Sequence, residues 1–138
     1  MEFKSINKFK KYLGIDYGRK RIGLALGDSE IKIATPFKIV NNIEEIIKII
    51  KNEEINELII GQPLKMRGRN LKMDNDFLEF LEILKEKVAI PIKLIDERLS
   101  SKAADALSGD KRTKAPRDTL AAMLILQTYF DKNFLVSF

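Results

Sequence analysis

The chain has 138 residues, with 25 lysine and arginine residues against 20 aspartate and glutamate residues, which gives a formal net charge of +5. It contains no cysteine and no histidine, which excludes disulfides, thiolate nucleophiles, imidazole bases and the usual zinc ligands. Acid–base or metal chemistry therefore has to use carboxylates, lysines, hydroxyls or the backbone. The length predicts one domain over residues 1–138, and the lack of a signal-peptide or membrane-spanning apolar run predicts a cytoplasmic protein.

Positive charge gathers in the predicted loops and negative charge in the predicted helices. Residues 41–57 hold five acids and two lysines, and residues 73–87 hold the same numbers. Residues 62–72 instead hold four cations and no acid, and residues 98–117 hold six cations and two acids. This distribution favours a polyanionic partner over the alternative of ordinary solvated loops.

Residues 12–28 predict a β-hairpin with a carboxylate at the end of its first strand. The apolar run 12–15 ends in Asp16, a turn with three cations follows, and a second apolar run covers residues 22–26. Gly14 and Gly18 flank Asp16, and glycines in such positions let another backbone or a ligand come close. A charge at the end of a core strand is costly unless it is paired, so we interpret Asp16 as a site for a divalent cation. The alternative is an aspartate that only stabilises the turn.

The rest of the chain alternates between strands and helices. Residues 31–40 predict a third antiparallel strand, with Pro36 at an edge or a bulge. The segments after it are a helix over 43–50, a strand over 57–60, a basic loop over 64–70, a helix over 74–88, a strand over 91–95, a short helix over 100–107, a basic loop over 108–116 and a helix from Asp118. This order predicts an α/β fold with a mixed five-stranded sheet, three antiparallel strands and then parallel βα units, and helices on both faces.

Acidic residues follow the predicted strands at the edge where ligands bind in open α/β sheets. Asp16 ends the first strand, Asp96 and Glu97 end the last, and Asp118 lies in the first turn of the final helix. Two carboxylates about 4 Å apart repel by about 4 kcal/mol at an effective dielectric near 20, so a cluster needs a proton or a hard cation. Mg²⁺ binds carboxylates, water and phosphate oxygens, and two such ions support phosphodiester hydrolysis without histidine.

Each acid also has a structural interpretation. Asp118 suits a helix N-cap, and Asp96 or Glu97 could pair with a nearby cation at the surface. Glu97 starts two strands away from Asp16, about 10 Å, so we expect Glu97 to reach across and Asp96 not to. Cations predicted at the same edge form a phosphate-binding rim of Lys20, Arg21, Arg67, Arg69, Arg98 and Lys102.

Four motifs in series resemble the YqgF family of RuvC-like proteins, described as Holliday-junction resolvases and as pre-16S rRNA nucleases. They are YLGIDYGRKRIGLALGD over 12–28, IGQPL over 60–64, DERLSS over 96–101 and DTLAAMLILQ over 118–127. The resemblance implies a ribonuclease-H-like fold and a cytoplasmic nuclease that uses Mg²⁺ or Mn²⁺. It implies a role in maturing the 5′ end of 16S rRNA, with Asp16, Glu97 and Asp118 as the catalytic metal ligands.

The resemblance leaves other functions open. The implied partner is RNA, as pre-16S rRNA or the pre-ribosome, with branched DNA as the alternative, no membrane, and a monomer or weak homodimer. A DNA junction resolvase and a catalytically idle RNA-binding assembly factor would share the same features. Gly-Ile-Asp-x-Gly also opens actin-like and sugar-kinase folds, but those proteins use two such domains around the nucleotide, and this chain has the length of one.

Overall fold

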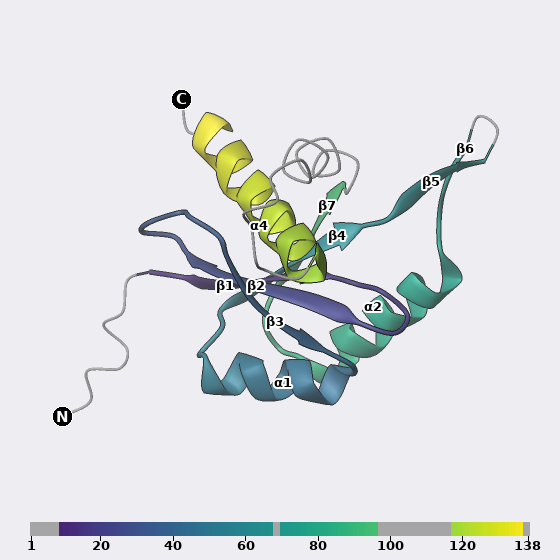
Figure 1. Cartoon of the computed structure of the whole chain (residues 1–138), viewed down its shortest axis with the longest axis horizontal. Coiled ribbons are helices and arrows are strands. Elements are labelled where there is room, and N and C mark those ends of the chain that lie inside the picture. Colours follow the sequence, from purple (N-terminus) through teal and green to yellow (C-terminus); the bar gives the residue numbers. More distant parts are fainter. Residues whose placement is uncertain (1–8, 68–69, 97–116, 137–138) are drawn as a thin grey trace.

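The computed structural model describes residues 9–67, 70–96 and 117–136. Its elements are β1 (Lys11–Asp16), β2 (Ile22–Asp28), β3 (Thr35–Val40), α1 (Ile43–Asn52), β4 (Glu57–Gln62), β5 (Leu64–Arg67), β6 (Asn70–Met73), α2 (Asn75–Lys87), β7 (Ile92–Asp96) and α4 (Arg117–Val136). Figure 1 shows how they are arranged around one main sheet. Within the described segments, no helix combines the length and apolar character needed to cross a membrane.

The main sheet has five strands in the order β3-β2-β1-β4-β7. β1 pairs antiparallel with β2, and β2 pairs antiparallel with β3. On its other side β1 pairs parallel with β4, and β4 pairs parallel with β7. The predicted mixed sheet is therefore confirmed, with β1 at its centre and its carboxyl end beside those of β4 and β7.

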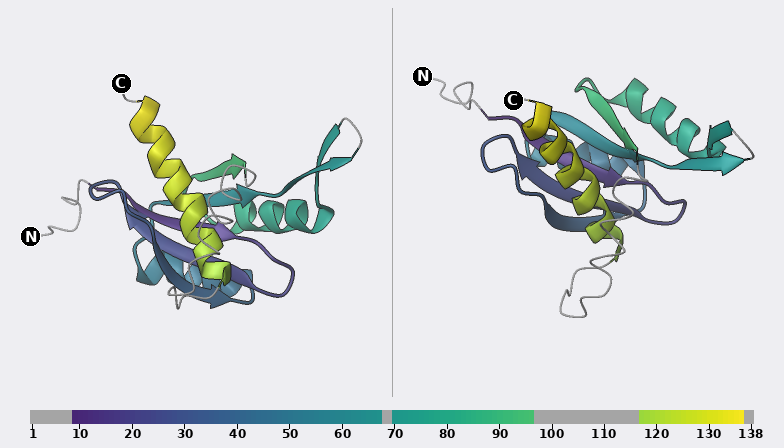
Figure 2. Two further views of the ribbon diagram at one scale, coloured as in Figure 1. Left: turned by 45° about the horizontal axis from the view of Figure 1, so that its top comes forward. Right: turned by 90° about the horizontal axis from the view of Figure 1, so that it is seen from above.

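Each face of the sheet has its own apolar core because side chains alternate along the strands. Leu13 and Ile15 of β1 pack in a cluster with α1 and α2, whereas Tyr12 packs in a second cluster with α4. Figures 1 and 2 show α1 and α2 together on one side of the sheet and α4 crossing the other. These sides are called the α1/α2 face and the α4 face below, and they confirm the prediction of helices on both faces.

The helices begin where local hydrogen bonds favour it. The side chain of Asn42 accepts a hydrogen bond of 3.0 Å from the Glu45 N–H and caps α1, as its sequence position predicts. The side chain of Asp74 accepts one of 3.1 Å from the Asp76 N–H at the start of α2. Helix α4 begins at Arg117, so Asp118 lies within its first turn rather than at the N-cap.

Two predicted segments differ in the structure. The third strand begins at Thr35 instead of residue 31, because the Asp28 side chain accepts hydrogen bonds from the Glu30 and Ile31 N–H groups and Lys32 has a φ of 59°, which together form a turn. β3 is an edge strand with a register shift opposite β2, which confirms the expectation for Pro36.

The predicted basic loop over 64–70 is also wrong, because most of it forms strands. β5 and β6 pair antiparallel as a separate two-stranded ribbon that extends from the end of β4 (Figures 1 and 2). Their sequence alternates between apolar and polar residues, which is the pattern of a strand. The predicted helix over 100–107 and loop over 108–116 lie outside the described residues.

Candidate active site

Asp16 is the last residue of β1, and the alternation of that strand places it on the α4 face. Tyr12 packs in the α4 cluster, and Gly14 abuts the Ala122 carbonyl of that helix. Asp16 follows Gly14 at the same two-residue spacing, and it is half-buried. Its carboxylate therefore belongs to the α4 face at the carboxyl end of the central strand.

Helix α4 meets this end of the sheet at Gly23. Gly23 is the direct partner of Asp16 in the β1–β2 ladder. A Cβ built on Gly23 would collide with the carbonyl oxygen of Asp118 and would lie 2.5 Å from its carbonyl carbon. The missing side chain thus lets the first turn of α4 rest on β2, beside the end of β1. The structure brings Asp16 and Asp118 to the same end of the same face.

The rest of α4 crosses the sheet over further glycines. A Cβ on Gly14 would lie 2.8 Å from the Leu126 Cβ and 2.9 Å from the Ala122 carbonyl oxygen. A Cβ on Gly27 would lie 2.7 Å from the ring of Phe130. The expectation that Gly14 admits another backbone is therefore confirmed, and the backbone is that of α4.

The donor set at this end suits a hard divalent cation. Asp16 and Asp118 offer carboxylate oxygens, which Mg²⁺ and Mn²⁺ prefer, and the chain has no histidine or cysteine to favour a softer metal. The amino-terminal end of α4 carries the positive end of its helix dipole, which offsets part of the repulsion between two acids placed there. Residues 16 and 118 could hold the metal, together with a third ligand from the substrate or from Glu97.

The third predicted ligand is not placed by the structure. Glu97 lies outside the described residues, and no group of three acids within the described part of the chain is arranged to hold a metal ion. Asp96 is described and is the last residue of β7, one residue after Ile95, which packs in the α4 cluster. By the alternation of the strand, Asp96 belongs to the opposite, α1/α2 face.

The predicted phosphate-binding rim is described only in part. Lys20 and Arg21 are exposed in the β1–β2 turn and form no ion pair with any residue that the structure describes. Arg67 is the last residue of β5, so it belongs to the ribbon rather than to a loop. The other three cations, Arg69, Arg98 and Lys102, lie outside the described residues.

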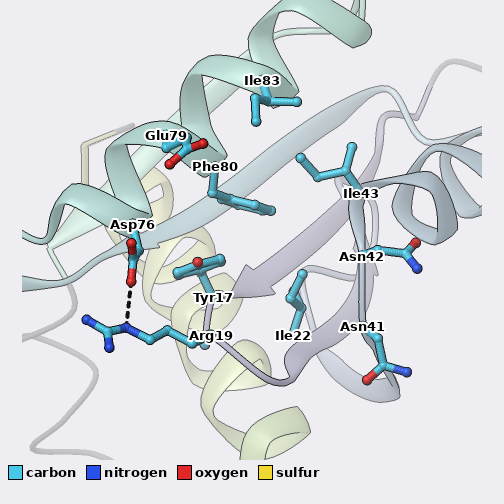
Figure 3. A pocket seen from close by; sticks show the side chains of 11 residues that line it. Tyr17, Arg19, Ile22, Asn41, Asn42, Ile43, Asp76, Glu79, Phe80 and Ile83 are labelled. Atoms are coloured by element: carbon cyan, nitrogen blue, oxygen red, sulfur yellow. Dashed lines mark ion pairs between the residues drawn. The ribbon is translucent and has the colours of Figure 1, made fainter.

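The third cation of the turn, Arg19, has a structural role. Its Nε lies 2.6 Å from an Asp76 carboxylate oxygen, and a terminal nitrogen lies 3.7 Å from an Asp74 oxygen. These contacts tie the β1–β2 turn to the start of α2, and Figure 3 shows the one with Asp76.

Sequence reasoning missed Gly23. Its signal was a glycine inside the apolar strand Ile22–Asp28, at a position where a strand gains nothing from glycine unless another backbone comes close. Gly14 and Gly18 are close to Asp16 in the sequence, whereas Gly23 is close to it only in the folded sheet. The strand pairing makes the difference visible, because residue 23 faces residue 16 directly.

The mixed five-stranded sheet with helices on both faces is a ribonuclease-H-like fold. The RuvC of Thermus thermophilus, in a complex with a Holliday junction substrate, superimposes with a TM-score of 0.59 over 91% of this chain and 96% of that chain, at 12% sequence identity. A second Thermus thermophilus RuvC structure gives a TM-score of 0.58. At this level of identity the likeness concerns the fold.

Sequence comparison identifies the family. A family model described as "RuvX: Holliday junction resolvase" matches residues 10–132, and the chain belongs to this family. A relative from Maridesulfovibrio salexigens is 36% identical over 130 residues, covering 86% of this chain and 96% of the relative. One from Sulfurihydrogenibium sp. is 37% identical over 131 residues, covering 88% and 90%. Both are named "Putative pre-16S rRNA nuclease", and the resemblance to the YqgF family is confirmed.

Proposed function

We propose that this protein is a metal-dependent endonuclease that hydrolyses phosphodiester bonds in structured nucleic acid. The observation that carries the proposal is the contact of the Asp118 backbone with Gly23, the ladder partner of Asp16. It supports the proposal because it brings the first turn of α4, which carries Asp118, against the ladder partner of Asp16 at the ligand-binding edge of the sheet. The family membership supports the same class of activity.

The cellular substrate that we propose is pre-16S rRNA, whose 5′ end the protein would mature during ribosome biogenesis in the cytoplasm, as a monomer or weak homodimer. The names of the relatives support RNA. Branched DNA is the second candidate, because the description of the family model and the fold of RuvC both point to junction cleavage.

In this proposal Asp16, Asp118 and Glu97 hold Mg²⁺ or Mn²⁺, which when bound supplies an activated water and stabilises charge on the phosphate. Asp16 is fixed by β1, and Asp118 is fixed by the contact of α4 with β2. The exposed Lys20 and Arg21, beside Asp16 in the turn, bind flanking phosphates. Arg67, Arg69, Arg98 and Lys102 extend this rim.

The test compares cleavage of two substrates, a pre-16S rRNA fragment that contains the 5′ processing site and a four-way DNA junction, with Mg²⁺, with Mn²⁺ and with EDTA. Asp16→Asn is expected to reduce cleavage at least about 100-fold while nucleic-acid affinity in EDTA is kept. Asp28→Asn is the matched control. It makes the same change at the end of β2, opposite Lys11 and therefore at the other end of the β1–β2 ladder from Asp16, and it keeps the oxygen that accepts hydrogen bonds from Glu30 and Ile31.

The outcomes separate the candidate functions. Cleavage of the RNA alone supports rRNA maturation, and cleavage of the junction alone supports a resolvase. Binding of RNA with no metal-dependent cleavage by the wild-type protein would contradict the proposal and favour an idle assembly factor. Equal loss of activity in Asp16→Asn and Asp28→Asn would show that the loss comes from the fold rather than from the site.

A further inference from the structure

The direction of the Asp118 carboxylate depends on how α4 is rotated about its own axis. The contact of the first turn with Gly23 is a backbone contact, so it sets how closely the helix approaches β2 but does not by itself set this rotation. The apolar side chains beneath the helix favour one rotation. Hydrogen bonds on the two flanks of α4 fix it more sharply, because they are directional.

One flank of α4 is held by Gln127. Its Oε1 accepts a hydrogen bond of 2.9 Å from the Ala34 N–H, and its Nε2 donates at 3.1 Å to the carbonyl oxygen of Lys32. Both partners lie in the connection between β2 and β3. Ala34 is buried, so its N–H needs an acceptor. The Asp131 carboxylate accepts the other Nε2 hydrogen at 3.1 Å, which fixes the orientation of the amide.

The opposite flank is held by Tyr129. Its hydroxyl donates to the buried carboxylate of Glu57 in β4 at 3.3 Å and accepts a hydrogen bond of 3.1 Å from Lys93 in β7. Residues 127 and 129 lie about 200° apart around an α-helix, because each residue adds about 100°. In the strand order β3-β2-β1-β4-β7, one anchor therefore lies toward the β3 edge of the sheet and the other toward the β7 edge.

The rotation that these anchors fix decides where Asp118 points. Asp118 precedes Tyr129 by 11 residues, which is about three full turns, so the two residues lie on the same flank of the helix. That flank faces β1, β4 and β7. The strand next to β2 on this side is β1, which carries Asp16, the ladder partner of Gly23. The half-buried Asp118 is therefore turned from β2 toward Asp16.

We propose that Gln127 is a positioning residue for Asp118. It holds the β3 flank of α4 against the β2–β3 connection and thereby keeps the Asp118 carboxylate aimed at Asp16. Nine residues of helix, about 13.5 Å, separate Gln127 from Asp118, so Gln127 acts through the helix and not on metal or substrate. This inference rests on the proposed function, because it takes Asp16 and Asp118 to share a metal ion.

The test measures the Mn²⁺ affinity of the full chain without nucleic acid, from the EPR signal of free Mn²⁺. Gln127→Ala is expected to weaken Mn²⁺ binding about tenfold, the lower end of the effect of residues that orient metal ligands. The Mg²⁺ concentration that gives half-maximal cleavage is expected to rise with it. A purely structural role would instead lower the fraction of folded protein, which reduces the number of binding sites and leaves the affinity of each site unchanged.

Thr128→Val is the matched control. The Thr128 hydroxyl donates to the Leu124 carbonyl of the same helix at 2.7 Å. The variant therefore loses a hydrogen bond within α4 and keeps both anchors to the sheet. Its Mn²⁺ affinity is expected to equal that of the wild-type protein.

A second pair of variants tests the direction of the hydrogen bonds. Gln127→Glu keeps an acceptor for the Ala34 N–H, but it loses the donor to Lys32 and places a carboxylate beside that of Asp131. It is expected to bind Mn²⁺ as weakly as Gln127→Ala. Adding Asp131→Asn replaces the repulsion by an amide donor, and the double variant is expected to recover the wild-type affinity to within about threefold, the effect of the one hydrogen bond still missing.

Equal Mn²⁺ affinity in the wild-type protein and in Gln127→Ala would overturn the inference, even where the wild-type protein cleaves its substrate. An equal loss of affinity in Thr128→Val would overturn it as well. Failure of the proposed nuclease function looks different, because a wild-type protein that cleaves nothing but binds Mn²⁺ more tightly than Gln127→Ala still supports the positioning role. A wild-type protein that binds no Mn²⁺ would overturn both.

Discussion

At the scale of single residues, the position of Asp118 relative to Asp16 depends on Gly23. Its backbone lies against the carbonyl of Asp118, and its ladder partner is Asp16. Gly23→Ala places a methyl group where the α4 backbone lies, and a backbone cannot move aside as a flexible side chain can. We expect the free energy of unfolding to fall by about 1–3 kcal/mol, the usual effect of an overpacked core. We expect cleavage to fall about 100-fold, because a displacement of about 1 Å at a catalytic group has that effect.

Gly27→Ala is the control for this prediction. Its methyl group would meet the ring of Phe130, at the other end of β2 from Asp118, so it should destabilise the chain without moving the site. Urea unfolding and cleavage rates measured at a temperature where both variants are folded separate the two effects. Full activity in Gly23→Ala, or the same loss of activity in Gly27→Ala, would show that the α4 contact does not position Asp118.

At the residue scale, the sequence signals of the proposed site are local ones. Asp16 was identified because it ends a predicted strand and lies between two glycines, a pattern that a few neighbouring residues are enough to reveal. Gly23 was missed because its importance depends on a helix that begins 94 residues later, at Arg117. The same limit applies to the Tyr17 and Phe80 rings, which pack against each other beside a pocket but come from distant segments.

At the scale of elements, the ribbon of β5 and β6 shows how a correct charge count led to a wrong structure. The four cations of residues 62–72 suggested a loop, but Leu-Lys-Met-Arg and Asn-Leu-Lys-Met each alternate as strands do. The register pairs Lys65 with Lys72 and Arg67 with Asn70, so these four positions share one face. Four apolar positions share the other face, namely Leu64, Met66, Leu71 and Met73.

This arrangement predicts that the polar face of the ribbon binds phosphates. Replacing Lys65 and Lys72 together by glutamine should weaken nucleic-acid binding and reduce the slope of log affinity against log salt concentration by about 1.4–1.8, since each lost phosphate contact contributes about 0.7–0.9. Fluorescence anisotropy over a range of salt concentrations measures both quantities. The matched control replaces the exposed Lys48 and Lys51 of α1, and its slope should stay at the wild-type value. A slope unaffected by the ribbon substitutions would remove β5 and β6 from the nucleic-acid surface.

At the scale of the whole molecule, a polar network at the far end of the sheet from Asp16 links both parallel strand pairs to α4. Glu57 of β4 is buried, and its carboxylate accepts a hydrogen bond of 3.3 Å from the Tyr129 hydroxyl. Lys93 of β7 donates to the same hydroxyl at 3.1 Å and lies 3.5 Å from a Glu57 oxygen. The ring of Tyr12, in β1, lies 5.6 Å from that of Tyr129. The elements of the predicted order were readable from periodicity, but this network depends on which strands become neighbours.

The network makes stability depend on alkaline pH. Burial, reinforced by Tyr129 and Glu57, raises the pKa of Tyr12 from 10.0 to about 12. The hydrogen bond to Tyr129 also raises the pKa of Lys93. Above the pKa values of the unfolded chain, the folded chain therefore binds more protons than the unfolded chain does, and the free energy of unfolding falls as the pH rises. Well below pH 10 both groups are protonated in the folded and in the unfolded chain, so they add no pH dependence to the free energy of unfolding.

Tyr12→Phe removes the largest of these contributions and keeps the ring. Between about pH 10 and about pH 12, the wild-type protein should lose up to about 1.4 kcal/mol for each pH unit from Tyr12, in addition to the loss from Lys93. The variant should lose less over the same interval, and urea unfolding at a series of pH values measures the difference. Parallel curves for the two proteins would mean that the Tyr12 hydroxyl ionises as easily in the folded chain as in the unfolded one. In that case α4 would pack less tightly over β1 and β4 in solution than it does in the structure.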